Sequence, residues 1–344
     1  MALFNSAQNR KPGFKLAVIA SLLAVVVVGL GAFTRLVHAG LGCPDWPGCY
    51  GHIWAPDEAH EIAQANEAHP DMPVNLEKTW PEMVHRYFAG SLVVLTLAIL
   101  FLAIKHRHKP GQPLKLPIFI LAFILLQAAF GMWTVTLKLW PQVVTAHLLG
   151  GFTMLSLLWL LTLRLNNQGW QLGDRDVGKI SSLRPWVVLG LVIVIAQITL
   201  GGWTTSNYAA LACPDFPTCH TAWLPPLDFA EGFNVMQHVG PNYLGGIMDN
   251  AARVTIHFMH RVGAVVTTIY TLLLVARLFA LGLSETRRMA LVLLAVLGAQ
   301  IALGISNVVF GLPLAVAVAH NLTGAVLLLA FVTLNHRVFT AQPR

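Results

Sequence analysis

The sequence predicts an all-α polytopic membrane protein whose eight transmembrane helices form two four-helix bundles related by a pseudo-twofold axis. Of its 344 residues, 56% are hydrophobic and only 11% are charged, with a mean hydropathy of +0.65, whereas about a quarter of the residues in soluble domains are charged. Apolar runs of about 20 residues, long enough to cross about 30 Å of hydrocarbon, occur eight times. The motifs of the first half also return in the second half.

The eight apolar segments are expected to be helices, because the alternating pattern of a membrane β-barrel is absent from the sequence. The first segment follows basic residues, as the apolar region of a signal peptide does. Its long apolar run and the lack of a small-residue cleavage site favour a retained helix. The predicted spans are 15–35, 86–105, 116–137, 143–165, 186–205, 254–281, 289–311 and 314–336.

The basic residues predict the orientation of the chain. Of the 22 Lys and Arg residues, 16 fall on the same side of the predicted helices as the N-terminus. The positive-inside rule makes this side the cytoplasm, so both termini are expected there. The same residues account for most of the net charge of +7, and no nucleic-acid partner is expected. We therefore expect a multi-pass protein of the bacterial inner membrane, in contact with lipid.

Two large loops, 36–85 and 206–253, are expected in the periplasm. They carry eight and four acidic residues and hold all four cysteines. Disulfides persist in such an oxidising compartment, and four cysteines allow three pairings. Spacing favours the local pairs Cys43–Cys49 and Cys213–Cys219 as structural staples, while an exchangeable redox role stays open for the first pair. Short helices, each capped by an aspartate, are expected over 57–68 and 228–237.

An internal repeat relates the two halves of the chain. The heptapeptide CPDWPGC at 43–49 recurs as CPDFPTC at 213–219, with five of seven residues identical. Each cysteine loop is followed by a helix that begins near a His-Arg pair, and one more histidine appears two helices later. The matching histidines, offset by 175 and 173 residues, are His85 with His260 and His147 with His320. Because each half has an even number of crossings, the repeat is parallel, which predicts two domains, 1–172 and 173–344.

Each half thus presents two imidazoles at similar depth on its second and fourth helices. Haem iron accepts two axial imidazoles, and an apolar bundle can enclose the macrocycle. The four histidines are therefore candidate haem ligands, and the adjacent Arg86 and Arg261 are candidate partners for the haem propionates. A lone histidine in a membrane helix often only hydrogen-bonds a neighbouring helix, but two matched pairs favour ligation. Zinc is less favoured, because the sequence offers no compact cluster of four ligands.

The two halves differ most clearly three residues before the first histidine. Glu82 precedes His85 in the first half, whereas His257 precedes His260 in the second. Residues three apart share a helix face, so a carboxylate accompanies one haem site and an imidazole the other. Such a carboxylate can move protons or stabilise a developing cation. The alternative is a glutamate that only favours the start of a helix, and either His257 or His260 can be the second-half ligand.

In combination, these motifs resemble those of the haem A synthase family, from about residue 31 to residue 328. The similar segments are GAFTRLVHAGLGCPDWPGC, EMVHR, TAHLLGG, HFMHR and VAHNLTG. The resemblance implies an enzyme that oxidises the C8 methyl group of haem O to a formyl group and so makes haem A for terminal oxidases. It also implies haem O as the substrate, supplied by a haem O synthase, and an electron acceptor that the sequence does not identify.

The resemblance further implies a role for each candidate residue. His260 and His320 are similar to the ligands of a resident haem b, His85 and His147 to the substrate-haem ligands, and Glu82 to the acidic catalytic residue. It implies successive oxidations with water as the oxygen source and with electrons leaving through the second haem. The second cysteine pair is not shared by every member, which argues against a redox role for Cys213–Cys219.

Two other functions use the same histidines. A two-haem cytochrome b that carries electrons to or from quinone would need all four, but it has no need of Glu82 or of the difference between the halves. A haem transporter or chaperone would need polar residues along its helices, and almost entirely apolar segments such as VVLTLAILFLA are closed to a polar substrate. We therefore rank the oxidising enzyme first, the electron carrier second and the transporter third.

Overall fold

The computed structural model describes residues 10–167 and 169–343 and is almost entirely helical. The two strands form a small parallel pair, β1 with β2. The elements in chain order are α1 (Phe14–Leu36), α2 (Ala59–Ala68), α3 (Leu76–Lys105), α4 (Lys115–Thr136), α5 (Pro141–Asn166), β1 (Gln171–Leu172), α6 (Asp174–Ser181), α7 (Arg184–Ser206), α8 (Phe229–Gly232), α9 (Asn250–Ala280), α10 (Ser284–Val309), α11 (Leu314–Phe339) and β2 (Gln342–Pro343).

Eight of these helices are long and apolar enough to cross a membrane, which confirms the predicted number of spans. The chain is therefore a multi-pass membrane protein. Most boundaries agree with the predicted ones within a few residues, but α3 begins at Leu76, well before the predicted start at Arg86. The Asn75 side chain caps this helix by accepting a hydrogen bond from the Glu77 N–H at 3.1 Å. Because of these extra turns, Glu82 lies on helix α3 before the predicted span, where it contacts the cysteine loop.

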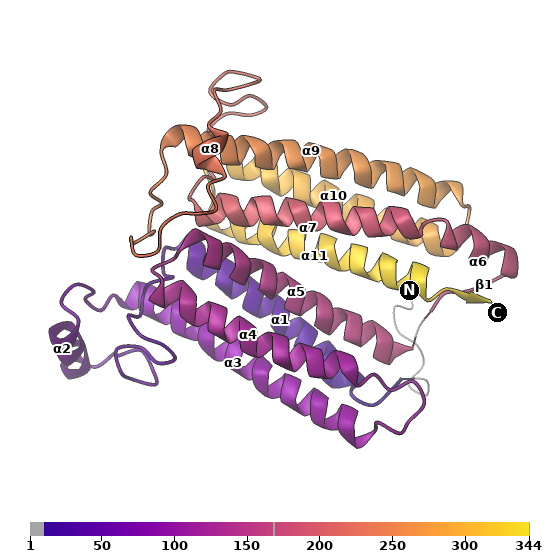
Figure 1. Cartoon of the computed structure of the whole chain (residues 1–344), viewed down its shortest axis with the longest axis horizontal. Coiled ribbons are helices and arrows are strands. Elements are labelled where there is room, and N and C mark those ends of the chain that lie inside the picture. Colours follow the sequence, from indigo (N-terminus) through magenta and orange to yellow (C-terminus); the bar gives the residue numbers. More distant parts are fainter. Residues whose placement is uncertain (1–9, 168, 344) are drawn as a thin grey trace.

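The spanning helices pack in two sets of four (Figure 1). In the first set α1 and α4 each contact both α3 and α5, and in the second set α7 and α10 each contact both α9 and α11. The histidine-bearing helices of each set, α3 with α5 and α9 with α11, thus lie diagonally opposite each other. The two sets meet through α1, α5, α7 and α11. Two separate domains, 1–172 and 173–344, remain a prediction.

Equivalent residues of the repeat meet between the two sets. His38 and Tyr208 each stand five residues before the first cysteine of their loop, and their rings stack with centroids 5.4 Å apart and an interplanar angle of 1°. Arg35 of α1 donates to the carbonyl oxygen of Thr205 at 2.6 Å and lies over the Tyr208 ring. A cation is favourable at this C-terminal end of α7, where unpaired carbonyls concentrate negative charge. These contacts are those expected beside a pseudo-twofold axis.

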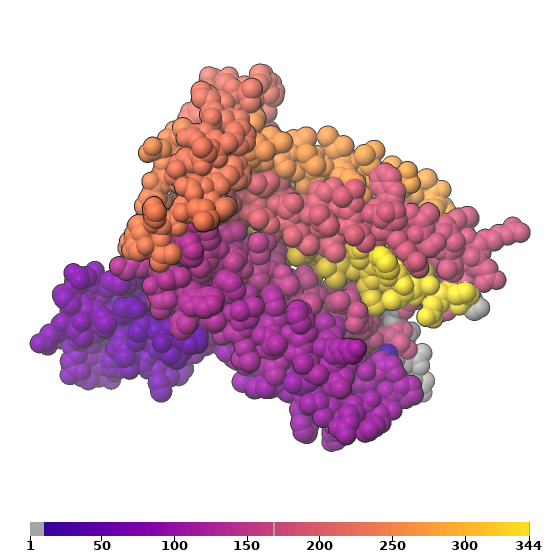
Figure 2. Space-filling model, viewed as in Figure 1, coloured from indigo at the N-terminus to yellow at the C-terminus, as the bar shows by residue number. Residues whose placement is uncertain are grey.

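Both cysteine loops project from the same end of the helices, opposite the C-terminus (Figures 1 and 2). They hold the two expected short helices, although α8 ends at Gly232, before the predicted end at residue 237. Asp228 caps α8 by accepting from the Glu231 N–H at 3.0 Å, as predicted. The predicted cap of α2 is wrong: Glu58 occupies the N-cap position, and Asp57 lies before it. The periplasmic location of these loops remains a prediction.

Candidate functional site

The four candidate histidines lie near the loop end of their helices, and each imidazole faces a glycine of a neighbouring helix. A side-chain carbon at that glycine would lie only 3.0 to 3.4 Å from Cε1 of the histidine, so a larger residue would displace the ring. The facing pairs are Gly31 with His85, Gly131 with His147, Gly201 with His260, and Gly304 with His320.

The glycines reveal a finer repeat that the sequence analysis missed. Each lies five residues before the last residue of its helix, on α1, α4, α7 and α10. Each of these helices then ends in the same way, with a backbone hydrogen bond of 2.7 to 2.9 Å that spans five residues, such as Ala39 N–H to Thr34 and Ala209 N–H to Thr204. A glycine-bearing helix followed by a histidine-bearing helix thus occurs four times. The common spacing from glycine to helix end was the signal available in the sequence.

The surroundings of the histidines fit axial ligation of haem. Within the described chain, Nδ1 of His85, His147 and His320 is buried and has no hydrogen-bond partner, which costs free energy in an apolar bundle. Iron satisfies one ring nitrogen. His147 is within electrostatic reach of His85, and His260 of His320, so each diagonal helix pair brings two imidazoles together. Among the described residues no three His, Cys, Asp or Glu side chains form another metal cluster.

Valine in place of Gly304 is expected to weaken haem binding in the C-terminal half. Its Cβ would lie 3.1 Å from Cε1 of His320, and overpacking of this kind costs about 1–3 kcal/mol, or about a 5- to 150-fold loss of haem affinity. Haem content per protein, read from the Soret absorbance after purification, measures the effect. Gly298→Val on the same helix is the control, because no atom lies within 4 Å of a Cβ there. Equal haem contents in the two variants would contradict this expectation.

The cysteine loops above the histidines are built alike. Disulfides join Cys43 to Cys49 and Cys213 to Cys219, which confirms the favoured pairing. In the second loop, the Asp215 carboxylate accepts from the Thr218 hydroxyl and from two backbone N–H groups, and these hydrogen bonds lower the pKa of Asp215 to about 2. Asp45 makes the equivalent backbone contacts in the first loop. The two loops are thus held by matching disulfides and aspartate hydrogen bonds.

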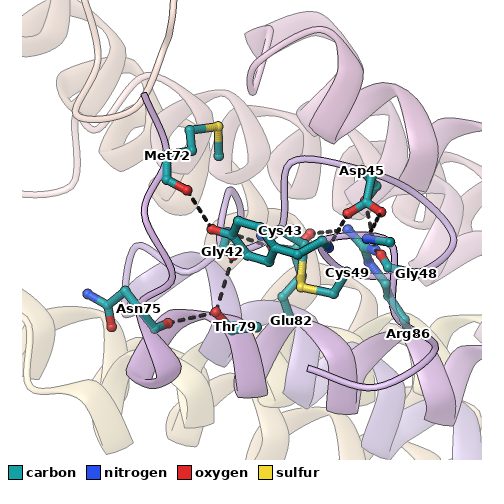
Figure 3. Close-up of a disulfide and its surroundings, with 12 residues drawn as sticks. Gly42, Cys43, Asp45, Gly48, Cys49, Met72, Asn75, Thr79, Glu82 and Arg86 are labelled. Atoms are coloured by element: carbon teal, nitrogen blue, oxygen red, sulfur yellow. Dashed lines mark hydrogen bonds and ion pairs between the residues drawn. A yellow bond between two sulfur atoms is a disulfide. The ribbon is translucent and has the colours of Figure 1, made fainter. Parts of the chain in front are cut away.

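Glu82 anchors the first loop to α3 (Figure 3). Its Oε2 accepts from the Gly42 N–H at 2.7 Å and the Cys43 N–H at 3.0 Å, and its Oε1 accepts from Arg86 at 2.5 Å. The carboxylate is buried. Three N–H donors around one carboxylate stabilise its negative charge. The Arg86 guanidinium also donates to the Gly48 carbonyl of the loop, so Glu82 and Arg86 hold the loop together.

His257 takes the place of Glu82 in the second half. Its Nδ1 accepts from the Cys213 N–H at 3.2 Å, and its Nε2 lies 3.2 Å from Nε of Arg261. Arg261 also donates to the carbonyl oxygens of Cys213 and Thr218. Both ring nitrogens of His257 are thus engaged, Nδ1 by the Cys213 N–H of the loop and Nε2 by Arg261 of α9, which favours His260 as the iron ligand. Contacts of Arg86 and Arg261 with haem propionates remain predictions.

Comparisons with known proteins agree with this arrangement. The chain matches the COX15-CtaA family, described as cytochrome oxidase assembly protein, over residues 14–332. The chain belongs to this family. Three similar proteins of the family are named heme A synthase: one from Shewanella oneidensis, 48% identical over 92% of this chain and 94% of its own; one from Allorhizobium ampelinum, 30% identical over 94% and 88%; and one from Sphingopyxis alaskensis, 27% identical over 92% and 89%.

The family match includes all the candidate site residues. The matched range of residues 14–332 contains both cysteine loops, the four histidines and Glu82. The resemblance to haem A synthases that the motifs indicated is thereby confirmed.

Proposed function

We propose that this chain is a haem A synthase that oxidises the C8 methyl group of haem O to a formyl group. The observation that carries this proposal is the 48% identity to a heme A synthase over 92% of the chain, joined with the paired histidines of each helix set. Haem O is the substrate. A haem O synthase is the kind of enzyme that supplies it, and the product serves the assembly of terminal oxidases.

The two haem sites have different roles in this proposal. His85 and His147 hold the substrate haem in the N-terminal helix set, and His260 and His320 hold a resident haem b in the C-terminal set. The diagonal placement of α3 with α5 and of α9 with α11 supports both assignments, because a flat macrocycle fits between diagonal helices of a bundle. The bound haem b supplies one-electron redox chemistry.

Glu82 is the proposed catalytic residue. Its three N–H donors favour a negative carboxylate at the start of α3, about one helical turn from His85, against the burial that raises the pKa of Glu82. A fixed negative charge there can stabilise a cation that develops on the substrate, or accept its proton. The contacts favour stabilisation of a cation over proton transfer, since hydrogen bonds already occupy both carboxylate oxygens of Glu82. In the other half His257 occupies this place. Its ring nitrogens contact Cys213 and Arg261, and an imidazole offers no negative charge.

The reaction needs water and an electron acceptor. Conversion of a methyl group to a formyl group with one water releases four protons and four electrons, so oxygen from water balances the reaction without a separate oxygen donor. We propose that the electrons leave through the C-terminal haem to an acceptor outside the chain. The basic residues support cytoplasmic termini and periplasmic cysteine loops in the inner membrane.

Haem extraction with mass identification tests this function. Protein co-expressed with a haem O source is expected to contain haem b together with haem O, an alcohol intermediate or haem A. Growth in water labelled with oxygen-18 is expected to place the label in the formyl group. A sample that contains only haem b would instead support the cytochrome b electron carrier, and an unlabelled formyl group would overturn water as the oxygen source.

A further inference from the structure

Glutamine stands four residues before the facing glycine in three of the four helix pairs. These positions are Gln127 on α4, Gln197 on α7 and Gln300 on α10, and the fourth, on α1, is Val27. Since four residues make about one helical turn, each side chain lies beside the glycine on the same helix face. The glutamine therefore lies one turn below the imidazole that the glycine faces.

In the C-terminal half both glutamines contact their histidines. Nε2 of Gln197 lies 3.2 Å from Nδ1 of His260 and donates to the His260 carbonyl at 3.0 Å. Nε2 of Gln300 lies 3.3 Å from Nε2 of His320. Each amide thus fixes the plane of an imidazole. Partners of this kind orient axial ligands and hold them on a metal.

A second glycine makes room for each glutamine. A Cβ at Gly150 would lie 1.7 Å from the Gln127 amide, one at Gly263 2.2 Å from the Gln197 amide, and one at Gly324 3.4 Å from that of Gln300. These glycines lie three or four residues after His147, His260 and His320. Gln127 therefore lies against the backbone turn that follows His147.

The His85 site lacks both parts of this arrangement. Val27 offers no amide, and Phe88 stands where Gly150 and Gly263 stand, three residues after the histidine. His85 rests against Gly31 and interacts with the backbone of Val27, but its buried Nδ1 has no hydrogen-bond partner. No hydrogen bond joins Gln127 to His147 either, and the buried Nδ1 of His147 is also without a partner, so the glutamine contacts of the described residues lie in the C-terminal half.

We propose that the substrate haem exchanges because no glutamine holds either of its two histidines, and that Val27 accounts for the missing amide at His85. This inference rests on the proposed function, because a substrate haem must bind and leave in every catalytic cycle whereas a resident haem b must stay. Beside His147, Gln127 packs against Gly150 and makes no hydrogen bond with the imidazole. Gln197 and Gln300 are positioning residues that retain the C-terminal haem. The difference between the two helix sets in these glutamine contacts is therefore a device for haem exchange.

The test restores the missing amide in the full-length, haem-loaded protein. The variant Val27→Gln with Phe88→Gly copies the Gln197 and Gly263 arrangement, and Val27→Met with Phe88→Gly is the control of similar size without an amide. Haem transfer to apomyoglobin is followed, with each haem identified by mass. Wild type is expected to lose haem O or haem A faster than haem b, and the glutamine variant is expected to slow that loss about tenfold relative to the methionine control.

Two further measurements separate positioning from general structure. Cyanide, which binds only where an axial ligand leaves, is expected to react first with the N-terminal haem and to need about ten times more ligand in the glutamine variant. Gln300→Met is expected to speed the loss of haem b. Equal loss rates in the glutamine and methionine variants, or faster loss of haem b than of haem O in wild type, would overturn the inference. If both sites hold haem b, the proposed function fails. The variants His147→Ala and His320→Ala then still show which rate of haem loss belongs to which site.

Discussion

Replacing Glu82 with histidine is expected to stop haem A formation while the cysteine loop stays folded and both haems stay bound. The second half of the molecule already shows this substitution, since His257 accepts a hydrogen bond from Cys213 where Glu82 accepts one from Cys43. A histidine at this position can therefore anchor the loop without supplying a fixed negative charge. We expect at least about a 100-fold loss of turnover, the usual effect of losing an electrostatic stabiliser of the transition state.

The measurement is haem A formed per bound haem O, with haem content and thermal stability recorded on the same samples. Glu82→Gln is the matched second variant, because it keeps the shape of the side chain and one carbonyl acceptor for the loop N–H groups. Both variants are expected to bind haem O and accumulate it. Normal haem A production by the histidine variant would mean that Glu82 serves the loop alone.

Replacing His260 with alanine is expected to remove haem b from the C-terminal half and to stop haem A formation. Iron loses one of its two axial ligands, and because even outer partners of a metal ligand change affinity by about 10- to 100-fold, we expect more than about a 100-fold loss of haem b affinity. His85 and His147 are untouched. The N-terminal half should therefore still bind haem O, which accumulates because its electrons have no path out.

His257→Ala is the control for this experiment. Both ring nitrogens of His257 are engaged by Cys213 and Arg261, so its loss is expected to loosen the second cysteine loop and leave haem b in place. Extracted haem identified by mass, with a reduced-minus-oxidised spectrum, distinguishes the two results. Loss of haem b from the His257 variant and its retention in the His260 variant would reverse the ligand assignment.

Hydropathy alone was enough to predict the spans. Backbone N–H and C=O groups have no partners in hydrocarbon other than each other, so a long apolar run has to be a helix. The same argument explains the imprecise end of α3, because its first turns lie outside the span and depend on the Asn75 cap instead of on hydropathy. The cap of α2 by Glu58 was missed for a similar reason, since two adjacent acidic residues compete for one helix start.

The sequence by itself determined the repeat, the disulfide spacing and the four histidines, because these are periodic features of residue type along the chain. Only the tertiary structure decided which glycine faces each histidine, that Glu82 binds the Cys43 loop, and that Val27 replaces a glutamine beside His85. The physical reason is that the sequence does not specify how far each helix is rotated about its own axis. A helix that is apolar on every side carries little information about which face turns inward, so contacts between such helices are set by the packing of all eight together.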